Sequence, residues 1–334
     1  MMQDKITLYF NLLNNSAQLL VADMDMTHTD ALIEIMEDFS QQKVRQENGH
    51  PSADVVKKIE MAMTEVDWQH ISTIDLRKAV QLAVLNANRE DQLPANYQIT
   101  PDGIGYLLAD LIDKTGFVDN AKIADMTVGS GNLLWTVKNL LQKNKKSATF
   151  IGLDGDETQL ALASATNMLL RDETIDLYQT DIVDTKEKIS ADVVIGDLPI
   201  GYYPLSGHND LIMSQIDDRP FVHELMIERS LDLVSAQGWI YLIVPANIFN
   251  TGHTKPLLKM LASKAQLKAF LRLPLEFFKT KDMQKAILVL RPKGISTKGE
   301  VLMGQYPALK DIKTLQDFLQ EIDAWVKLDK ELNQ

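Results

Sequence analysis

The stretch Asp125-Met126-Thr127-Val128-Gly129-Ser130-Gly131-Asn132-Leu133-Leu134 decides the fold of this chain of 334 residues. It follows a short apolar run and leads into a segment with helical spacing, which predicts a strand-to-helix turn. Two glycines two residues apart permit a tight turn and let backbone N–H groups approach a ligand. The N-terminus of the following helix adds donors and the positive end of its dipole. Leu134 stands where the dinucleotide fingerprint has its third glycine, and no Gly-Lys-Ser or Gly-Lys-Thr occurs. NAD, FAD and an ATP P-loop are therefore disfavoured.

From about residue 100 onward, short apolar runs alternate with helical stretches. The runs cover residues 122–125, 149–154, 192–196 and 239–244, and two more lie around 267–273 and 286–290. Strands that are apolar on both faces and separated by helices predict a parallel sheet with helices on each side. The last two runs lie close together, which predicts an antiparallel pair at one edge. The fold class expected is a doubly wound, Rossmann-like α/β sheet.

The first 95 residues show only helical patterns. Apolar residues recur at helical spacing over 31–39 and 55–63, with breaks at Gly49-His50-Pro51 and near Asp67. This region carries eight basic and fifteen acidic residues, so it is a poor candidate for gripping DNA directly. We expect an N-terminal all-helical domain over 1–95 and a catalytic α/β domain over 96–334.

Composition excludes several classes of protein. The chain is 45% hydrophobic and 24% charged, as in ordinary globular proteins. It has no apolar run near the length of about 20 residues that spans a bilayer, and its start does not resemble a signal peptide. We therefore expect a cytoplasmic protein without a membrane segment. With no cysteine and six scattered histidines, a metal site is not expected.

The net charge of −12 argues against a protein that coats nucleic acid over its whole surface. The charge is uneven, however. Residues 251–300 hold three acids and eleven basic residues, a net +8: Lys255, Lys259, Lys264, Lys268, Arg272, Lys279, Lys281, Lys285, Arg291, Lys293 and Lys298. This segment could hold a phosphate backbone, or it could consist of solvated faces that happen to be rich in lysine.

Acids follow the next two expected strands. Asp154 ends the strand after the glycine loop, and a carboxylate there can accept both hydroxyls of a ribose. Asp181 ends a candidate third strand and could accept from an adenine amino group. Either acid alone could be a turn residue or a helix cap. Upstream, Thr100-Pro101 predicts the start of a helix running to Lys114, whose N-terminus could bind a ligand carboxylate.

The order of these motifs resembles a known family. Thr100-Pro101, Asp125 to Leu133, Asp154, Asp181 and Asp197-Leu198-Pro199-Ile200 are similar to the motifs of N6-adenine DNA methyltransferases. The likeness is greatest to the modification subunit of type I restriction systems and its small stand-alone relatives in Gram-positive bacteria. It covers residues 96–295, including a fifth strand with its exit loop at 238–246 and the segment 271–278.

The resemblance implies S-adenosylmethionine (SAM) as cofactor. The positions that match the family's cofactor site are Thr100, Pro101, Asp125, Thr127, Gly129, Ser130, Gly131, Asn132, Leu133, Asp154, Gly155, Asp181 and Ile182. In the family the helical domain helps to clasp DNA. Only about 40 residues follow the core, too few for a target-recognition domain, so a separate specificity or regulatory protein is an expected partner.

The family's catalytic tetrad is Asp/Asn-Pro-Pro-aromatic, and here it reads Asp197-Leu198-Pro199-Ile200. An adenine N6 amine is a poor nucleophile because its lone pair is delocalised into the ring. A carboxylate such as that of Asp197, with the Leu198 carbonyl, can accept its two protons and aim it at the methyl group. The aromatic residue stacks on the flipped base. Its absence at Ile200 could forfeit about 1–3 kcal/mol unless Tyr202 or Tyr203 replaces it.

Three functions are compatible with these motifs. The leading one is methylation of adenine N6 in DNA. The second is methylation of RNA or of a protein amide, since such amines need the same paired acceptors. The third is a non-catalytic SAM-binding regulator. Tyr202, Tyr203 and Phe221 could equally be core or lid residues, and His208 and His223 are expected in loops or at the surface.

Overall fold

The structure is a computed structural model that describes residues 4–68, 70–94, 97–115, 118–186, 188–204, 210–294 and 299–332. The chain divides into two compact units. Unit 1 comprises Met1–Ile99, Val128–Asn132 and Asp154–Gln179, and unit 2 comprises Thr100–Thr127, Leu133–Leu153 and Thr180–Gln334. The domain limit at 95/96 falls outside the described residues and stays a prediction.

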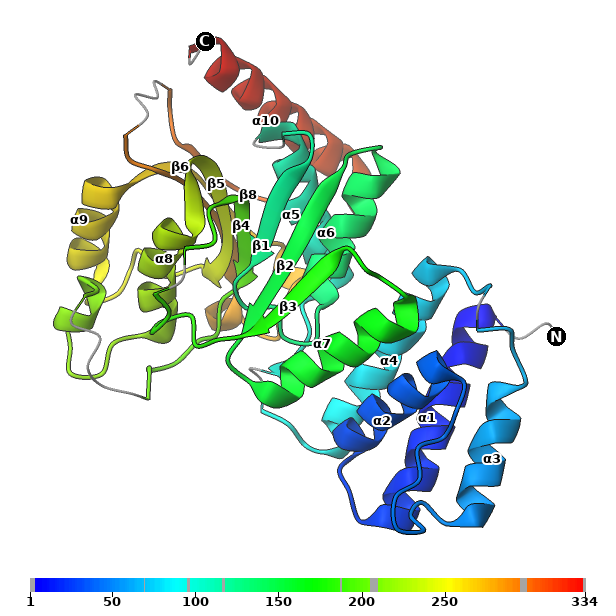
Figure 1. The fold of residues 1–334 in the computed structure, drawn as a ribbon. Coiled ribbons are helices and arrows are strands. Elements are labelled where there is room, and N and C mark those ends of the chain that lie inside the picture. Colours follow the sequence, from blue (N-terminus) through cyan, green and yellow to red (C-terminus); the bar gives the residue numbers. More distant parts are fainter. Residues whose placement is uncertain are drawn as a thin grey trace. The chain divides into compact units, whose positions relative to one another are not determined.

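Unit 1 is mainly helical (Figure 1). Its elements are α1 (Lys5–Met24), α2 (His28–Gln41), α3 (Ala53–Met63), α4 (Thr73–Glu90), α7 (Glu157–Leu170) and β3 (Ile175–Gln179). Thr27 caps α2 by accepting from the Asp30 N–H. Asp91, after α4, accepts from the N–H groups of His28 and Thr29, which ties the end of α4 to the start of α2. α7 packs against α2 and α4.

Unit 2 contains most of the sheet. Its elements are α5 (Asp102–Thr115), β1 (Ala121–Asp125), α6 (Asn132–Lys143), β2 (Ala148–Asp154), β4 (Ala191–Asp197), η2 (Met213–Gln215), α8 (Val222–Leu233), β5 (Val234–Pro245), α9 (Thr254–Lys264), β6 (Ala265–Arg272), η3 (Leu275–Phe277), η4 (Lys281–Met283), β7 (Lys285–Pro292), β8 (Leu302–Gln305) and α10 (Ile312–Leu332). The strand order is β3-β2-β1-β4-β5-β7-β6-β8. Every strand run predicted from about residue 100 onward is present, and the predicted doubly wound α/β fold with N-terminal helices is confirmed. Within the described residues, no helix combines the length and apolarity needed to cross a membrane.

β7 runs against its neighbours. β1, β2, β4 and β5 pair in parallel, β7 pairs antiparallel with both β5 and β6, and β6 pairs in parallel with β8. The predicted antiparallel pair β6–β7 is therefore confirmed, but it does not form the edge, because β8 lies beyond β6. Since β8 has only four residues, one of them glycine, no apolar run marks it in the sequence.

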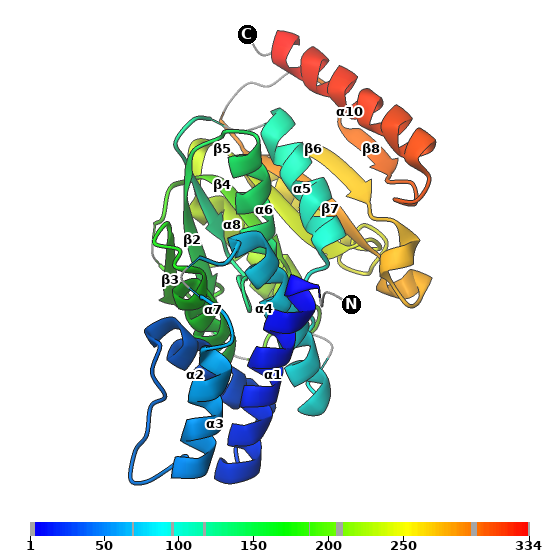
Figure 2. The ribbon, with the colours of Figure 1, turned by 90° about the vertical axis from the view of Figure 1, so that its right-hand side faces the viewer.

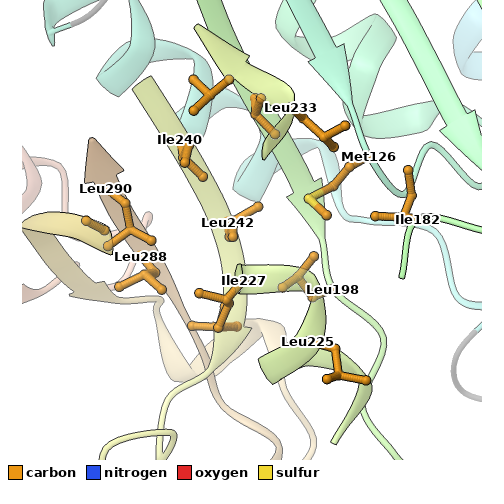
Figure 3. Close-up of a cluster of buried hydrophobic side chains, with 14 of the residues drawn as sticks. Met126, Ile182, Leu198, Leu225, Ile227, Leu233, Ile240, Leu242, Leu288 and Leu290 are labelled. Carbon is orange, nitrogen blue, oxygen red and sulfur yellow. The ribbon is translucent and has the colours of Figure 1, made fainter. Parts of the chain in front are cut away.

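Helices cover both faces of the sheet in unit 2. α8 and α9 lie on one face and α5 and α6 on the other (Figures 1 and 2). On the first face, Leu225 and Ile227 of α8 pack with Leu242 of β5 and Leu288 of β7 (Figure 3). On the second, the Tyr241 and Thr115 hydroxyls lie 2.5 Å apart, which joins β5 to α5.

α10 lies over the outer strands β6 and β8. Its buried residues are Ile322, Val326 and Asp329, and Asp329 Oδ1 accepts from Lys268 Nζ of β6 at 2.5 Å. A Cβ on Gly304 of β8 would lie 3.1 Å from the Phe318 ring, so a glycine there lets the helix approach. The last helix is also tied to α5, because Lys114 pairs with Asp323 at 2.8 Å and Lys330 Nζ donates to the Lys114 carbonyl at 3.0 Å.

Candidate functional site

The carboxyl ends of the parallel strands in unit 2 meet at one edge of the sheet, where doubly wound folds bind their ligands. Asp197, the last residue of β4, pairs with Ile243 of β5, and Pro245 at the end of β5 pairs with Lys285. Because β7 is antiparallel, Lys285 is its first residue and reaches this same edge. This edge of the sheet therefore carries both the carboxylate of Asp197, from the parallel strand β4, and the ammonium group of Lys285, from the antiparallel strand β7.

The Asp197 carboxylate is held through both oxygens. Oδ2 accepts from Thr100 Oγ1 at 2.8 Å, and Oδ1 accepts from Lys285 Nζ at 2.5 Å. The side chains of Asp197 and Lys285 are 18% and 21% exposed. Thr100, expected to help bind a ligand carboxylate, thus donates its hydroxyl to Asp197. α5 begins at Asp102, and its first turn closes on the Pro101 carbonyl, which accepts from the Gly105 N–H at 3.2 Å. The helix therefore starts one residue later than the predicted pattern, in which Thr100 is the cap and Pro101 the first helical residue.

The segment after β6 packs on the start of α5. A Cβ on Gly103 would lie 2.6 Å from Cζ of Phe277, so a larger residue at this point of the helix would displace that ring. Phe277 lies in η3, within the segment 271–278 that carries part of the family resemblance. The close approach brings this segment to the helix that follows Thr100.

The loop after Asp197 is pinned at several points. Leu198 is fully buried and donates its N–H to Ile243 O at 3.0 Å. Thr127 Oγ1 donates to the Asp197 carbonyl at 3.4 Å. Beyond the tetrad, Tyr203 N–H donates to Pro220 O, and Tyr202 forms an isolated bridge with Phe221, the residue before α8. These contacts hold the backbone of Tyr202 and Tyr203 beside the start of α8.

The two tyrosines after the tetrad have different surroundings. Tyr202 is 55% exposed, and its ring stacks on Phe221 with centroids 4.8 Å apart and planes inclined by 16°. Arg219 Cζ lies 5.2 Å from the Tyr202 centroid. Tyr203 is buried, and its hydroxyl donates to Asp181 Oδ2 at 2.5 Å. Of the two candidates for the missing aromatic, only Tyr202 presents its ring at the surface; the aliphatic side chain of Ile200 is also exposed.

Asp181 is engaged within its own loop. Oδ1 accepts from Val183 N–H at 2.9 Å, which is the turn geometry expected if this acid were a turn residue. Burial and the contact with Asp181 raise the pKa of Tyr203, so its hydroxyl remains a donor at neutral pH. Ile182 beside it is buried in the core. Each Asp181 oxygen keeps acceptor capacity for a further donor.

His223 is buried, so the expectation that it lies at the surface is wrong; His208 lies outside the described residues. Burial first, and then the charges of Lys285 and His253, lower the pKa of His223 to about 4. Its ring is 5.3 Å from that of Phe221, and His253 Nδ1 lies 2.9 Å from the buried Glu224. His223 lies on the inward face of α8. The sequence does not predict this burial, because a single histidine in a helix can face either the core or the solvent.

Unit 1 contains the glycine loop and the next acid. Asp154 Oδ2 accepts from Gly129 N–H at 2.8 Å, and Oδ1 accepts from Asp156 N–H at 2.9 Å. Gly129 and Gly131 have φ of +52° and +91°, conformations that favour glycine. Burial raises the pKa of the Asp154 carboxyl, although the N–H groups oppose the effect. Asp154 is therefore half-buried, anchored to the loop, and able to accept further donors.

Two further contacts in unit 1 were not foreseen from the sequence. Asn132 Oδ1 accepts from Nη1 of the buried Arg77 at 2.8 Å. Tyr97 donates its hydroxyl to Asp156 Oδ2 at 2.9 Å, while Asp156 Oδ1 caps α7. The helix-cap interpretation therefore applies to Asp156, whereas Asp154 binds the glycine loop through the Gly129 N–H. Gly155 between them is exposed.

The remaining site positions are supporting ones. Thr127 N–H donates to Asp125 Oδ1 at 3.1 Å, and Asp125 is fully buried. Leu133 is also buried. Ser130 and Pro199 are partly buried. These residues shape the turn after β1 and the turn after β4.

The basic segment does not form one continuous charged face. Lys264 and Lys268 pair with Glu228 and Asp329, and Lys285 pairs with Asp197. Arg291 lies over the Trp239 ring, and Lys298 is outside the described residues. The exposed members are Lys255, Lys259, Arg272, Lys279, Lys281 and Lys293. A cavity of about 500 Å³ opens beside Arg272, with Phe249, Phe270 and Met303 in its lining.

Comparison with known proteins finds two matching families. Residues 7–87 match the family described as the YtxK N-terminal helical domain, and residues 86–323 match N-6 DNA Methylase. A curated relative, the uncharacterized protein YtxK of Bacillus subtilis (strain 168), is 30% identical over 336 residues, which is 99% of this chain and 100% of that protein.

Solved structures show the same architecture. A putative class I S-adenosylmethionine-dependent methyltransferase from Listeria monocytogenes has a TM-score of 0.88 and 27% identity, covering 96% of this chain and 98% of that one. A modification subunit of a putative type I restriction enzyme from Vibrio vulnificus YJ016 has a TM-score of 0.66 at 11% identity, covering 95% and 89%. At that identity the second likeness concerns the fold alone.

Proposed function

Since this chain belongs to the N-6 DNA methylase family and is a SAM-dependent methyltransferase, we propose that it methylates the N6 amine of adenine in DNA. The observation that carries the proposal is the position of the Asp197 carboxylate. This carboxylate is fixed by two donors at the end of β4, and Asp197 is the first residue of the segment that matches the family's catalytic tetrad. Leu198 supplies the backbone carbonyl that would accept the second amine proton.

The cofactor is SAM, and residues of this chain fit it. Asp154 is a half-buried carboxylate oriented by two backbone N–H groups, as the binding of a pair of ribose hydroxyls requires. Gly129 and Gly131 hold positive φ, so their N–H groups can approach a ligand closely. We propose that Asp181 accepts from the adenine amino group of SAM, held for this by Tyr203.

The chain's own contribution to the chemistry is positioning. SAM supplies an electrophilic methyl group on a sulfonium sulfur. The target amine's lone pair forms the new N–C bond, the electrons of the methyl–sulfur bond stay on sulfur, and one amine proton leaves to water. Asp197 and the Leu198 carbonyl accept the two N–H groups beforehand, which localises the lone pair and aims it at the methyl.

Tyr202 is the residue we propose to stack on the target base in place of the aromatic missing at Ile200. It is exposed, and Phe221 supports its ring from one side. Base stacking on an aromatic side chain is worth about 1–3 kcal/mol. We propose that Arg219, whose guanidinium lies over the Tyr202 ring, contacts a phosphate or the base itself.

DNA is the proposed partner because the exposed basic residues of the segment 251–294 include Arg272, Lys279 and Lys281, on or just after β6. Arg272 ends β6, which runs parallel to β4 in the sheet, so these cations lie toward the edge that carries Asp197. We also propose that a separate specificity protein reads the DNA sequence, since the similar protein from Vibrio vulnificus is itself a subunit of a putative type I restriction enzyme.

The test is methylation of duplex DNA of mixed sequence, scored as N6-methyladenine by mass spectrometry. Asp197→Ala should abolish the product while leaving the Kd for SAM within about twofold. The matched control is Asp282→Ala, an exposed acid in the β6–β7 connection, which should retain activity. Unchanged methylation in Asp197→Ala would refute the assignment.

The ion-paired state of Asp197 and the exposed Ile200 favour, as the second candidate, a non-catalytic SAM-binding regulator. If the wild-type chain binds SAM but yields no methyladenine, tritiated SAM and a bacterial lysate separate the remaining functions. Label removed by ribonuclease indicates RNA, label removed by protease indicates a protein amide, and no label at all indicates a non-catalytic regulator.

A further inference from the structure

Lys285 occupies an unusual place for a cation. It is the first residue of β7, the strand that runs against its neighbours, and so reaches the sheet edge where β4 and β5 end. Its Nζ lies 2.5 Å from Asp197 Oδ1, and its side chain is 21% exposed. Its positive charge also contributes to the low pKa of the buried His223. Lys285 is therefore part of the site, although in the sequence it stands out only as one member of a basic segment.

Two donors from different elements hold the carboxylate of Asp197. Thr100 Oγ1 reaches Oδ2 from the start of α5, and Lys285 Nζ reaches Oδ1 from β7. A free carboxylate turns easily about its terminal torsion, which has broad minima. With one donor on each oxygen, rotation of the carboxylate plane would break at least one short contact. Each oxygen still has acceptor capacity for an incoming N–H.

We propose that Lys285 is the positioning residue of Asp197, orienting its carboxylate for the substrate amine and offsetting its charge in a partly buried site. The inference rests on the proposed function of Asp197. An ammonium group has no acceptor, so Lys285 cannot itself hold the amine protons. It acts through Asp197, and its loss should slow turnover without changing the contacts expected to bind SAM.

A second ion pair of the same segment provides a matched control. Lys264 Nζ lies 2.6 Å from Oε1 of Glu228, a residue that also accepts from the N–H groups of Ile212 and Met213. Lys264 ends α9, and its ion-pair partner is Glu228 rather than Asp197. Removing it breaks an ion pair with a buried acid elsewhere in unit 2. A purely structural role of Lys285 would therefore be matched by Lys264→Met.

The experiment measures kcat and KM on a duplex oligonucleotide containing adenine, with the Kd for SAM by calorimetry, in the full chain. Lys285→Met should lower kcat roughly 10- to 100-fold, the cost of a small misplacement of a reacting group, with the Kd for SAM within about twofold. Lys285→Arg should restore most of kcat, and Lys264→Met should keep it within about twofold. In an Asp197→Asn background, Lys285→Met should cause no further loss.

Three results would overturn the inference: wild-type kcat in Lys285→Met, an equal loss in Lys264→Met, or a full further loss in the Asp197→Asn background. A higher kcat for Lys285→Met than for the wild type would also overturn it, because the ion pair would then inhibit Asp197 instead of positioning it. Failure of the proposed function looks different. It appears as full activity in Asp197→Ala, or as no methyladenine from the wild-type chain.

Discussion

Replacing Asp154 should weaken SAM binding far more than replacing Asp156, two residues away. Both are acids beside the glycine loop, yet their oxygens are used differently. Asp156 accepts from the Gln159 N–H and the Tyr97 hydroxyl, so its two oxygens serve the protein's own structure. Asp154 is fixed by the N–H groups of Gly129 and Asp156 and retains acceptor capacity on both oxygens.

The expected magnitude follows from two ribose hydroxyls donating to one carboxylate. A hydrogen bond to a charged group is worth about 1.5–3 kcal/mol. At the lower bound, two of them amount to about 3 kcal/mol, which is roughly two decades in Kd at about 1.4 kcal/mol per decade. Asp154→Ala should therefore raise the Kd for SAM about 100-fold. Asp156→Ala removes a helix cap, should cost about 1 kcal/mol of stability, and should change the Kd only a few-fold.

Calorimetric titration with SAM, alongside thermal unfolding to check folding, measures both effects. The pH dependence gives a second readout. Burial raises the pKa of the Asp154 carboxyl above its ordinary value, and the ribose hydroxyls need the ionised form. SAM affinity should therefore fall as the pH drops through that raised pKa, and Asp154→Ala should remove this dependence. Equal Kd values for folded Asp154→Ala and the wild type would contradict the reasoning.

Three further outcomes are expected. Tyr202→Leu should lower kcat/KM on DNA about 5- to 150-fold through loss of about 1–3 kcal/mol of stacking, whereas Tyr202→Phe should not; identical losses in steady-state assays would exclude stacking. His223 stays neutral when folded, with a pKa of about 4 against about 6.5 when unfolded, so the unfolded chain binds the extra proton. Stability should thus fall by roughly 3 kcal/mol from about pH 6.5 to about pH 4, and urea unfolding of His223→Leu should show a smaller fall. Glu228→Gln should lower the free energy of unfolding by about 2–4 kcal/mol, because three donors share its buried carboxylate. The same urea assay should show a change below about 0.5 kcal/mol for the exposed Glu173→Gln. An equally small change for Glu228→Gln would count against this role.

The periodicity of apolar residues is enough to predict most of the fold. Runs such as 192–196 and 239–244 are long and apolar on both faces, so they predict buried parallel strands regardless of tertiary detail. β8 escapes prediction because Leu302–Gln305 has no such run, and its pairing depends on β6 and on α10 lying over it. A short edge strand of this kind is set by its neighbours rather than by its own residues.

Site residues can be predicted from the sequence where a polar residue directly follows a predicted strand. Contacts between segments that are distant in the sequence cannot be predicted in this way. Asp154, Asp181 and Asp197 each follow an apolar run, which indicates their place at the sheet edge. The partners of Asp197 are 97 and 88 residues away in sequence, so no local pattern could reveal them. The contrast between Tyr202 and Tyr203 likewise depends on which way the loop is pinned.

The modest anchoring of α10 has a consequence for local opening of the molecule. The helix has 21 residues but buries only Ile322, Val326 and Asp329, and it is also attached by polar contacts such as Lys268–Asp329 and Lys114–Asp323. Elements with few buried apolar side chains open locally at a small fraction of the global unfolding free energy. Amide hydrogens of α10 should therefore exchange with solvent well before those of β5. Each such opening also removes the helix from the face of β8, the outermost strand of the sheet, and an outermost strand can pair with an extended segment of another chain.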